Sequence, residues 1–139
     1  MTTPTPAVEG LFTDEGGDAR LLGSRCATCA TPYFPRSGRC HNPGCDESAT
    51  EDASFGPAGT LWSFSVQNYP PPPPARTDDP YVPYALGVVD LDDGLRVVGR
   101  MDVADPNDLS VGGRVELVLA PMCHDEDGTE VITWMFRPV

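Results

Sequence analysis

The sequence contains no lysine, since all nine of its basic side chains are arginine. The chain therefore cannot use a lysine of its own to form a Schiff base with a carbonyl substrate. Histidine is scarce too, with only His41 and His124. No serine-elbow motif is present, and no Gly-rich phosphate loop follows an expected strand. These absences favour a binding or partner module over a self-sufficient catalyst.

Long apolar runs and positive charge are also missing. No apolar stretch approaches the length needed to span a membrane. The formal net charge of −12 argues against binding a phosphate backbone, which requires an excess of cations. The first ten residues have neither a basic start nor an apolar core, so we expect no secretory signal and predict a cytoplasmic protein.

Cysteine, by contrast, occurs in a pattern typical of a metal site. Cys26 and Cys29 form one close pair, and Cys40 and Cys45 form a second after ten intervening residues. Two tight turns of this kind can bring four thiolates to the corners of a tetrahedron, so the spacing predicts a zinc site. Two disulfides or an iron centre are the alternatives. A shell of four cysteines leaves no open position, so the predicted zinc is structural, and His41 is expected to be a loop residue.

The fifth cysteine, Cys123, stands beside His124 and invites comparison with a Cys–His nucleophile pair. No local signature supports that interpretation, and a plain thiol is the favoured one. Near the first cysteine pair, Tyr33 and Phe34 are expected to pack beside the metal as the core of the small module.

The rest of the chain favours short strands, because glycine and proline number 14 and 16. The alternation over 60–66 predicts a strand that buries Trp62, Phe64 and Val66 on one face. Residues 46–52 are expected to be an acidic connector. Further strands are expected over 84–91, 95–103, 114–120 and 130–136.

Five short strands fit a closed barrel of the oligomer-binding (OB) type, and a small sandwich is the alternative. We therefore predict a mostly β protein in three parts. A partly disordered tail spans 1–19, a zinc ribbon spans 20–53, and a five-stranded OB-fold barrel spans 54–139.

Two surface features could meet a partner or ligand. A proline run follows Tyr69, and such a run serves equally well as a docking edge, as a lip over a cleft or as a stiff spacer. The candidate contact residues here are Tyr69, Pro70, Pro71, Pro72, Tyr81 and Tyr84. The ribbon also carries a local group of arginines, which either meets an acidic or phosphate-bearing ligand or forms a solvated face. This group consists of Arg20, Arg25, Arg36 and Arg39.

The ordered combination of these motifs resembles a known family, the acyl-CoA-associated zinc-ribbon and OB-fold proteins, long catalogued as a domain of unknown function. The resemblance covers roughly residues 21–136. It depends on residues 25–29, 33–35, 40–45, 59–64, 80–81, 85–94, 96–100 and 111–115. It implies a rubredoxin-like zinc ribbon in which Cys26, Cys29, Cys40 and Cys45 are the metal ligands.

The resemblance also implies a role. Such proteins accompany thiolase-like enzymes, including those of the sterol-carrier-protein type, and act on CoA thioesters. Some occur beside or fused to hot-dog-fold enoyl-CoA hydratases. A similar domain is the partner of a thiolase-like aldolase that performs retro-aldol cleavage in steroid side-chain degradation. The expected function is a noncatalytic partner subunit in such a complex, with a structural zinc. A stand-alone acyl-CoA-binding protein and a single-stranded nucleic-acid-binding OB module are the alternatives.

Two departures from the family pattern stand out. The family usually begins with a longer helical segment that carries a Phe-Trp pair, whereas here only Leu11 and Phe12 precede a Gly-rich acidic stretch. The chain is therefore a candidate for an excised domain of a longer hydratase fusion. The second cysteine pair is also wider than the usual form.

Overall fold

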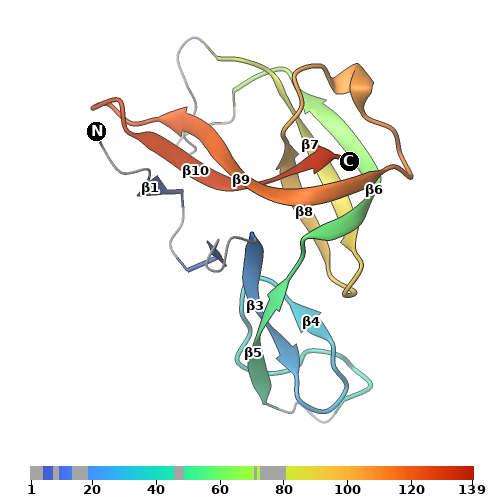
Figure 1. The fold of residues 1–139 in the computed structure, drawn as a ribbon. Helices are drawn as coiled ribbons and strands as arrows, with labels where there is room; N and C mark the ends of the chain where they lie inside the picture. The colour runs from blue at the N-terminus through green and yellow to red at the C-terminus, as the bar shows by residue number, and fades with distance from the viewer. Residues whose placement is uncertain (1–4, 8–9, 14–18, 46–48, 71, 73–80) are drawn as a thin grey trace.

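The computed structural model describes residues 5–7, 10–13, 19–45, 49–70, 72 and 81–139. Regular structure in these residues is strand, apart from one 3-10 turn, η2 (Pro106–Asp108). Figure 1 shows two bodies, a barrel and a narrower sheet beneath it. The predicted mostly β class is therefore confirmed. No helix among the described residues is long and apolar enough to cross a membrane.

Five strands close the barrel. They are β6 (Ala58–Gln67), β7 (Tyr84–Leu91), β8 (Arg96–Met101), β9 (Arg114–His124) and β10 (Glu130–Pro138). Their order is β6-β7-β8-β10-β9, and β9 pairs again with β6. The β8–β10 pair is parallel and the other four pairs are antiparallel. This is the Greek-key order of an OB fold, which confirms the closed barrel over the sandwich.

The barrel interior follows from strand alternation. Along β7 every second residue is buried, including Ala85, Val89 and Leu91, and the residues between them are half-buried. The same period of two places Val97 and Met101 of β8 in the core. A tight turn at Asp92–Gly94, where Gly94 has a φ of 99°, connects these strands as the sequence predicts.

The predicted buried face of β6 is wrong in two of its three residues. Trp62 is 54% exposed and Val66 is 37% exposed, whereas Leu61 is fully buried. The register of β6 against β7 shifts between Leu61 and Ser63. Such a bulge inserts one residue and exchanges the faces on either side of it, so alternation read from the sequence cannot continue through it.

The smaller sheet contains β2 (Phe12–Thr13), β3 (Arg20–Cys26), β4 (Pro32–Tyr33) and β5 (Thr50–Phe55). Strand β3 is its centre and pairs antiparallel with the other three. Residues 50–52 therefore belong to a strand, which corrects the predicted acidic connector; residues 46–48 lie outside the described residues. In the N-terminal tail, β1 (Thr5–Pro6) also pairs in parallel with β10.

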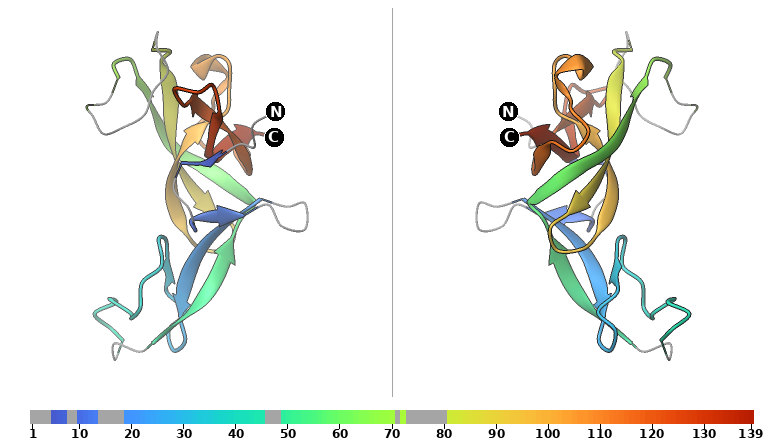
Figure 2. Two further views of the ribbon diagram at one scale, coloured as in Figure 1. Left: turned by 90° about the vertical axis from the view of Figure 1, so that its left-hand side faces the viewer. Right: turned by 90° about the vertical axis from the view of Figure 1, so that its right-hand side faces the viewer.

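The two bodies share one hydrophobic core. Leu21 of β3 and Phe55 of β5 are fully buried in the same cluster as Leu117 and Phe136 of the barrel. Figure 2 shows β5 running on into β6 across this junction, and the domain boundary predicted between residues 53 and 54 falls within β5. The ribbon and barrel are therefore packed against each other.

Aromatic side chains and an arginine complete the junction. Phe34 meets Trp134 edge to face with 5.3 Å between ring centroids, and Phe12 lies 6.3 Å from the same indole. Arg25 donates to the backbone oxygen of Asp93 at 2.8 Å, across to the β7–β8 turn. Phe34 thus packs on the barrel, which corrects its expected place beside the metal site.

Strands β9 and β10 extend beyond the barrel wall. Only residues 114–116 of β9 pair with β6, and only Met135 and Phe136 of β10 pair with β8. The remaining length of β9 and β10 pairs with each other as a hairpin arm, residues 119–134, whose β10 strand also carries β1 on its outer edge. Figure 1 shows this arm reaching away from the barrel. This arm forms one side of the groove described below.

Candidate metal centre and surface groove

The first cysteine pair lies where β3 ends. Cys26 is the last residue of β3, and its backbone N–H donates to the Thr31 oxygen at 2.9 Å. Between them Ala30 adopts a φ of 62° and donates to the Cys26 oxygen at 3.1 Å. The amides of Thr28 and Cys29 each lie 3.4 Å from the Cys26 Sγ. This tight turn points both sulfurs of the pair to one side.

The second, wider pair is shaped by Asn42. Its side-chain oxygen accepts from the Gly44 amide at 3.0 Å, and its backbone oxygen accepts from the Cys45 amide at 3.0 Å. The Asn42 amide lies 3.4 Å from the Cys40 Sγ. Asparagine commonly forms such local turns, and here the turn accommodates the two extra residues between the cysteines.

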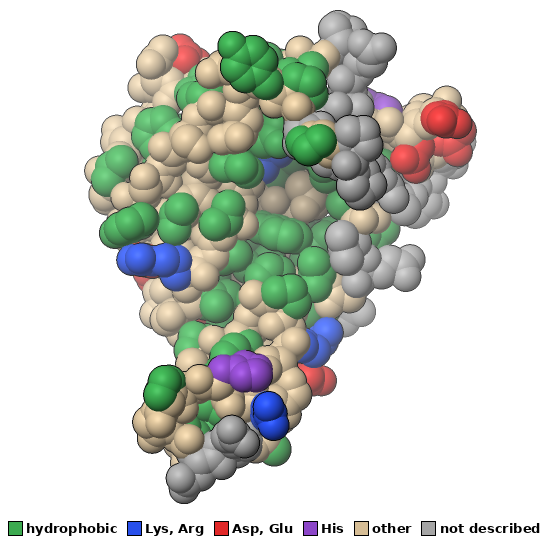
Figure 3. Space-filling model, turned by 180° about the vertical axis from the view of Figure 1, so that it is seen from behind, with side chains coloured by type: hydrophobic (Ala, Val, Ile, Leu, Met, Phe, Trp, Pro, Cys, Tyr) green, Lys and Arg blue, Asp and Glu red, His purple; other side chains and the backbone are tan. Residues whose placement is uncertain are grey.

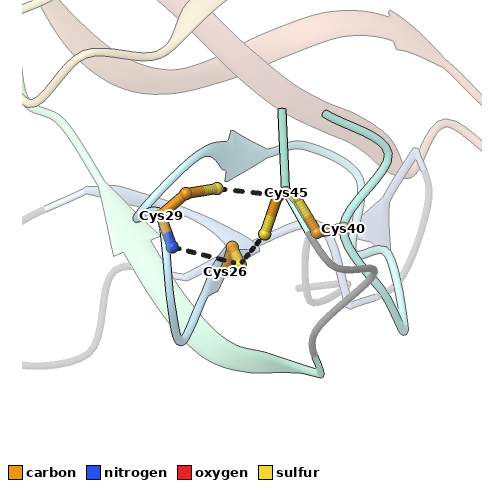
Figure 4. Close-up of side chains that lie close together, drawn as sticks. All are labelled: Cys26, Cys29, Cys40 and Cys45. Carbon is orange, nitrogen blue, oxygen red and sulfur yellow. Dashed lines mark hydrogen bonds between the residues drawn. The ribbon is translucent and has the colours of Figure 1, made fainter. Parts of the chain in front are cut away.

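All four sulfurs converge, as Figure 4 shows, and their Sγ atoms lie within 4.8 Å of one another. The Sγ–Sγ distance is 3.7 Å for Cys26–Cys45 and 3.6 Å for Cys29–Cys40. Zinc–sulfur bonds of about 2.3 Å in a tetrahedron place the sulfurs about 3.8 Å apart. Disulfide-bonded sulfurs lie about 2 Å apart. The cluster therefore fits a four-thiolate zinc site.

The surroundings favour the thiolate form that zinc requires. The Thr31 hydroxyl, 3.0 Å from the Cys29 Sγ, is the main cause that lowers the pKa of Cys29 to about 6. The backbone N–H of Cys29, followed by that of Thr28, lowers the pKa of Cys26.

Tyr33 supports the site from the second coordination layer. Its hydroxyl donates to the Cys40 Sγ at 3.2 Å and accepts from the His41 amide at 2.6 Å. The bond to Cys40 is the main cause that raises the pKa of Tyr33. Tyr33 therefore lies beside the metal site, as the sequence predicts. His41 lies outside the cluster, with its Nε2 3.0 Å from the Ser37 hydroxyl oxygen, which fits its expected place in a loop.

A second feature lies on the outside of the barrel, between the hairpin arm and strands β7 and β8. It is a groove of about 170 Å³. Figure 3 shows the molecule from behind, where hydrophobic side chains gather over the barrel and the surface is hollowed among them. The groove is lined by Tyr84, Leu86, Val98, Gly99, Arg100, Met122, Thr133 and Trp134.

Of the predicted contact residues, the structure brings Tyr81 and Tyr84 together beside this groove, with ring centroids 6.2 Å apart. The Tyr81 hydroxyl donates to the Gln67 oxygen at 2.7 Å, and burial is the main cause that raises its pKa. Tyr69 is 83% exposed. Pro70 and Pro72 are exposed as well, whereas Pro71 and residues 73–80 lie outside the described residues.

Two family models match this chain in succession. The ChsH2 rubredoxin-like zinc ribbon domain matches residues 14–51, and the ChsH2 C-terminal OB-fold domain matches residues 54–120. Together they span most of the chain and agree with the cysteine cluster and the barrel.

The chain belongs to the ChsH2 zinc-ribbon and OB-fold family.

Several named proteins resemble this ChsH2-family chain over most of its length. A DUF35 domain-containing scaffold protein of Methanothermobacter thermautotrophicus is 31% identical to this chain. The match covers 85% of this chain and 86% of the length of that protein. The benzoylsuccinyl-CoA thiolase subunit BbsA of Thauera aromatica is 29% identical to this chain, and the match covers 90% of this chain and 81% of the length of BbsA. A solved structure described as the Ltp2-ChsH2(DUF35) aldolase matches with a TM-score of 0.63 and 27% identity, over 86% of this chain and 84% of that one.

Cys123 and His124 follow the residues that the OB-fold family model matches, and the structure separates their side chains. They are consecutive residues of β9, and consecutive residues of a strand point to opposite faces. Cys123 is 2% exposed and His124 is exposed. The pair therefore does not form a Cys–His couple, in keeping with the favoured interpretation of Cys123 as a plain thiol.

The arginine group of the ribbon is largely engaged within the chain. Arg25 donates to the backbone oxygens of Ala30 and Asp93, and Arg36 pairs with Asp52 at 3.2 Å. Arg25 therefore links the ribbon to the barrel, and Arg36 links two segments within the ribbon.

Sequence reasoning missed two residues around the metal centre, Asn42 and Thr31, and one in the groove, Arg100. Asn42 and Thr31 hydrogen-bond to each other at 3.2 Å across the cysteine cluster. The sequence Asn-Pro-Gly inside the second cysteine pair could have indicated Asn42 as a turn residue. The hydroxyl contact of Tyr33 depends on how the loop after β4 folds back to place Cys40 and His41 beside the ring. The place of Arg100 depends on how β8 packs beside β7 and the hairpin arm.

Proposed function

We propose that this chain is a noncatalytic partner subunit of a thiolase-like enzyme that acts on acyl-CoA thioesters. In the form we favour, that enzyme is a retro-aldol lyase in steroid side-chain degradation. The chain assembles with the enzyme, stabilises it and shapes the path by which the acyl-CoA substrate reaches its site. The catalytic nucleophile and base belong to the partner. A hot-dog-fold enoyl-CoA hydratase is a further candidate partner.

The similarity over both modules carries this proposal. One relative is described as a subunit of a thiolase, and the matching structure is described as an aldolase that contains a ChsH2 component. Both matches extend over at least 86% of this chain, so they include the ribbon, the junction and the barrel together. A shared arrangement of both modules supports a shared role as a partner.

Within this role the metal centre is structural. We propose Cys26, Cys29, Cys40 and Cys45 as the zinc ligands, and Tyr33 and Thr31 as the side chains that orient them. A zinc ion held by four thiolates would supply cross-linking of the two cysteine turns and would have no position for a substrate. The proposed organisation is a tail over 1–19, the ribbon over 20–53 and the barrel over 54–139, in a cytoplasmic complex.

Affinity capture from the native host tests the proposal. The full chain carrying a purification tag should retain a thiolase-like protein, identified by mass spectrometry. The recovered enzyme should lose thiolase or retro-aldol turnover when this chain is withdrawn and regain turnover when it is added back. If the enzyme is equally active and stable alone, the proposal is wrong.

Calorimetry with CoA thioesters distinguishes the stand-alone alternative. A partner subunit should bind them only weakly by itself, because the substrate site is completed by the enzyme. Tight binding by the isolated chain would favour an independent acyl-CoA-binding protein. Binding of labelled single-stranded DNA at low ionic strength would favour the nucleic-acid module, against the net charge of −12.

A further inference from the structure

Arg100 differs from the other arginines of the barrel strands. Three of those arginines form ion pairs on the outside of the molecule: Arg96 with Asp90, Arg114 with Asp92, and Arg137 with Glu116. Arg100 is half-buried and forms no ion pair with the described residues. Among the arginines of the barrel strands in the described residues, Arg100 is thus the one available to pair with a carboxylate from another molecule.

The Arg100 side chain is nevertheless held in place. Its guanidinium lies over the Tyr84 ring, 3.7 Å from the centroid. It donates one hydrogen bond, at 3.1 Å, to the Met122 oxygen of the hairpin arm. A guanidinium has five N–H donors, so most of its capacity is unused within the described residues. A preorganised, partly desolvated cation of this kind binds a carboxylate more strongly than a fully hydrated one does.

The groove around Arg100 is apolar and small. Val98 is 53% exposed, and Leu86, Met122 and Trp134 also line the groove. Its volume of about 170 Å³ is below the roughly 300–1,000 Å³ of pockets that enclose small molecules. The space therefore fits one apolar side chain better than it fits an acyl-CoA group. Aromatic residues, methionine and arginine are also the types enriched where proteins bind each other.

We propose that this groove is a docking site for a segment of the thiolase-like partner in which an apolar side chain stands next to a carboxylate. The apolar side chain packs against Val98 and Trp134, and the carboxylate pairs with Arg100. This inference depends on the proposed function, because it assigns the partner a place on the barrel. It adds the chemistry of the segment that the partner must present.

The test measures the affinity of the full chain for the thiolase-like protein captured from the host. Two substitutions address the two halves of the groove: Arg100→Gln removes the positive charge, and Val98→Asp places a carboxylate on the exposed apolar wall. Each should weaken binding about tenfold or more, as expected when a desolvated charge pair or a central apolar contact is lost. The dependence of affinity on salt should also decrease for Arg100→Gln.

Each variant has a matched control. Arg96→Gln removes an equal charge from the same strand and the same outward face, and Val111→Asp introduces a carboxylate at a valine that is 65% exposed outside the groove. Both controls should bind within about threefold of wild type. Thermal melts of all four variants identify any that fails to fold. Val98→Asp changes a surface position, so it is expected to fold even if Arg100→Gln is destabilised.

The outcomes separate this inference from the proposed function. If the unmodified chain captures no thiolase-like protein, the proposed function and the docking site fail together. If the unmodified chain captures the partner but a folded Arg100→Gln or Val98→Asp variant binds within about threefold of it, only the groove is wrong. Equal weakening by the control variants would also overturn the groove as the specific docking site.

Discussion

At the scale of single residues, the metal centre depends on side chains that are not cysteines. Tyr33 donates its hydroxyl to the Cys40 Sγ and accepts from the His41 amide, so it fixes both a ligand and the loop that carries it. Partners of metal ligands commonly change metal affinity by 10- to 100-fold when they are removed. Removal of the Tyr33 hydroxyl should therefore weaken the affinity of the site for zinc.

We expect Tyr33→Phe to bind zinc about tenfold more weakly than wild type, because the Cys40 thiolate loses its donor while the ring keeps its packing. Competition with a chromophoric chelator at constant pH measures this directly. Tyr69→Phe is the control, since Tyr69 is 83% exposed and its loss of hydroxyl should leave zinc affinity unchanged. Equal zinc affinity in Tyr33→Phe and wild type would show that the contact does not stabilise the site.

At the scale of strands, the approach of β8 to β10 depends on a glycine. A Cβ at Gly99 would lie 2.7 Å from the Phe136 Cε2 and 3.0 Å from the Trp134 Nε1. The indole of Trp134 donates to the Val98 oxygen at 3.1 Å through this close approach. Phe136 is fully buried, so its ring has no space into which to move.

Gly99→Ala should therefore reduce the free energy of unfolding by about 1–3 kcal/mol, the usual cost of overpacking a filled core. Denaturant titration followed by circular dichroism measures the change. Gly38→Ala is the matched control, because a Cβ at Gly38 would meet no atom within 4 Å, and it should stay within about 0.5 kcal/mol of wild type. A Gly99→Ala protein as stable as the control would mean that β8 and β10 can separate at little cost.

At the scale of the whole molecule, the ribbon that carries the metal site contacts the barrel at the junction. Phe34 follows β4 of the ribbon and contacts Trp134 of β10. A small module of this kind depends on its metal for folding. Loss of zinc should therefore break the contact between Phe34 and the indole of Trp134, a residue far from the four cysteines in the sequence.

We expect a strong chelator under reducing conditions to shift the fluorescence emission of Trp134 to longer wavelength, as its ring gains contact with water. The chain has two tryptophans, so the measurement uses Trp62→Phe, which leaves Trp134 as the single indole. Returning zinc should reverse the shift. If the metal is removed and the emission stays constant, the junction holds without the ribbon's metal site.

Features with a local physical cause were predictable from the sequence. The cysteine turns depend on residues only a few positions apart, and the turn Asp92–Gly94 joins two alternating strands that the same local pattern reveals. The closed barrel followed from the number and length of these strands. The side assigned to Trp62 was wrong, because a bulge depends on how β6 meets β7 rather than on β6 alone.

The sequence by itself thus determined the four-thiol cluster, the strand content and the family to which the chain belongs, since each is encoded in short spacings or in their order. Only the tertiary structure decided that Phe34 packs against the barrel and that the Tyr33 hydroxyl donates to the Cys40 Sγ. It also decided that Arg100 lies in an apolar groove without a carboxylate partner in the described residues. Those facts are tertiary contacts, and they arise from the folding of the cysteine loops, the packing of the ribbon against the barrel and the closure of the barrel.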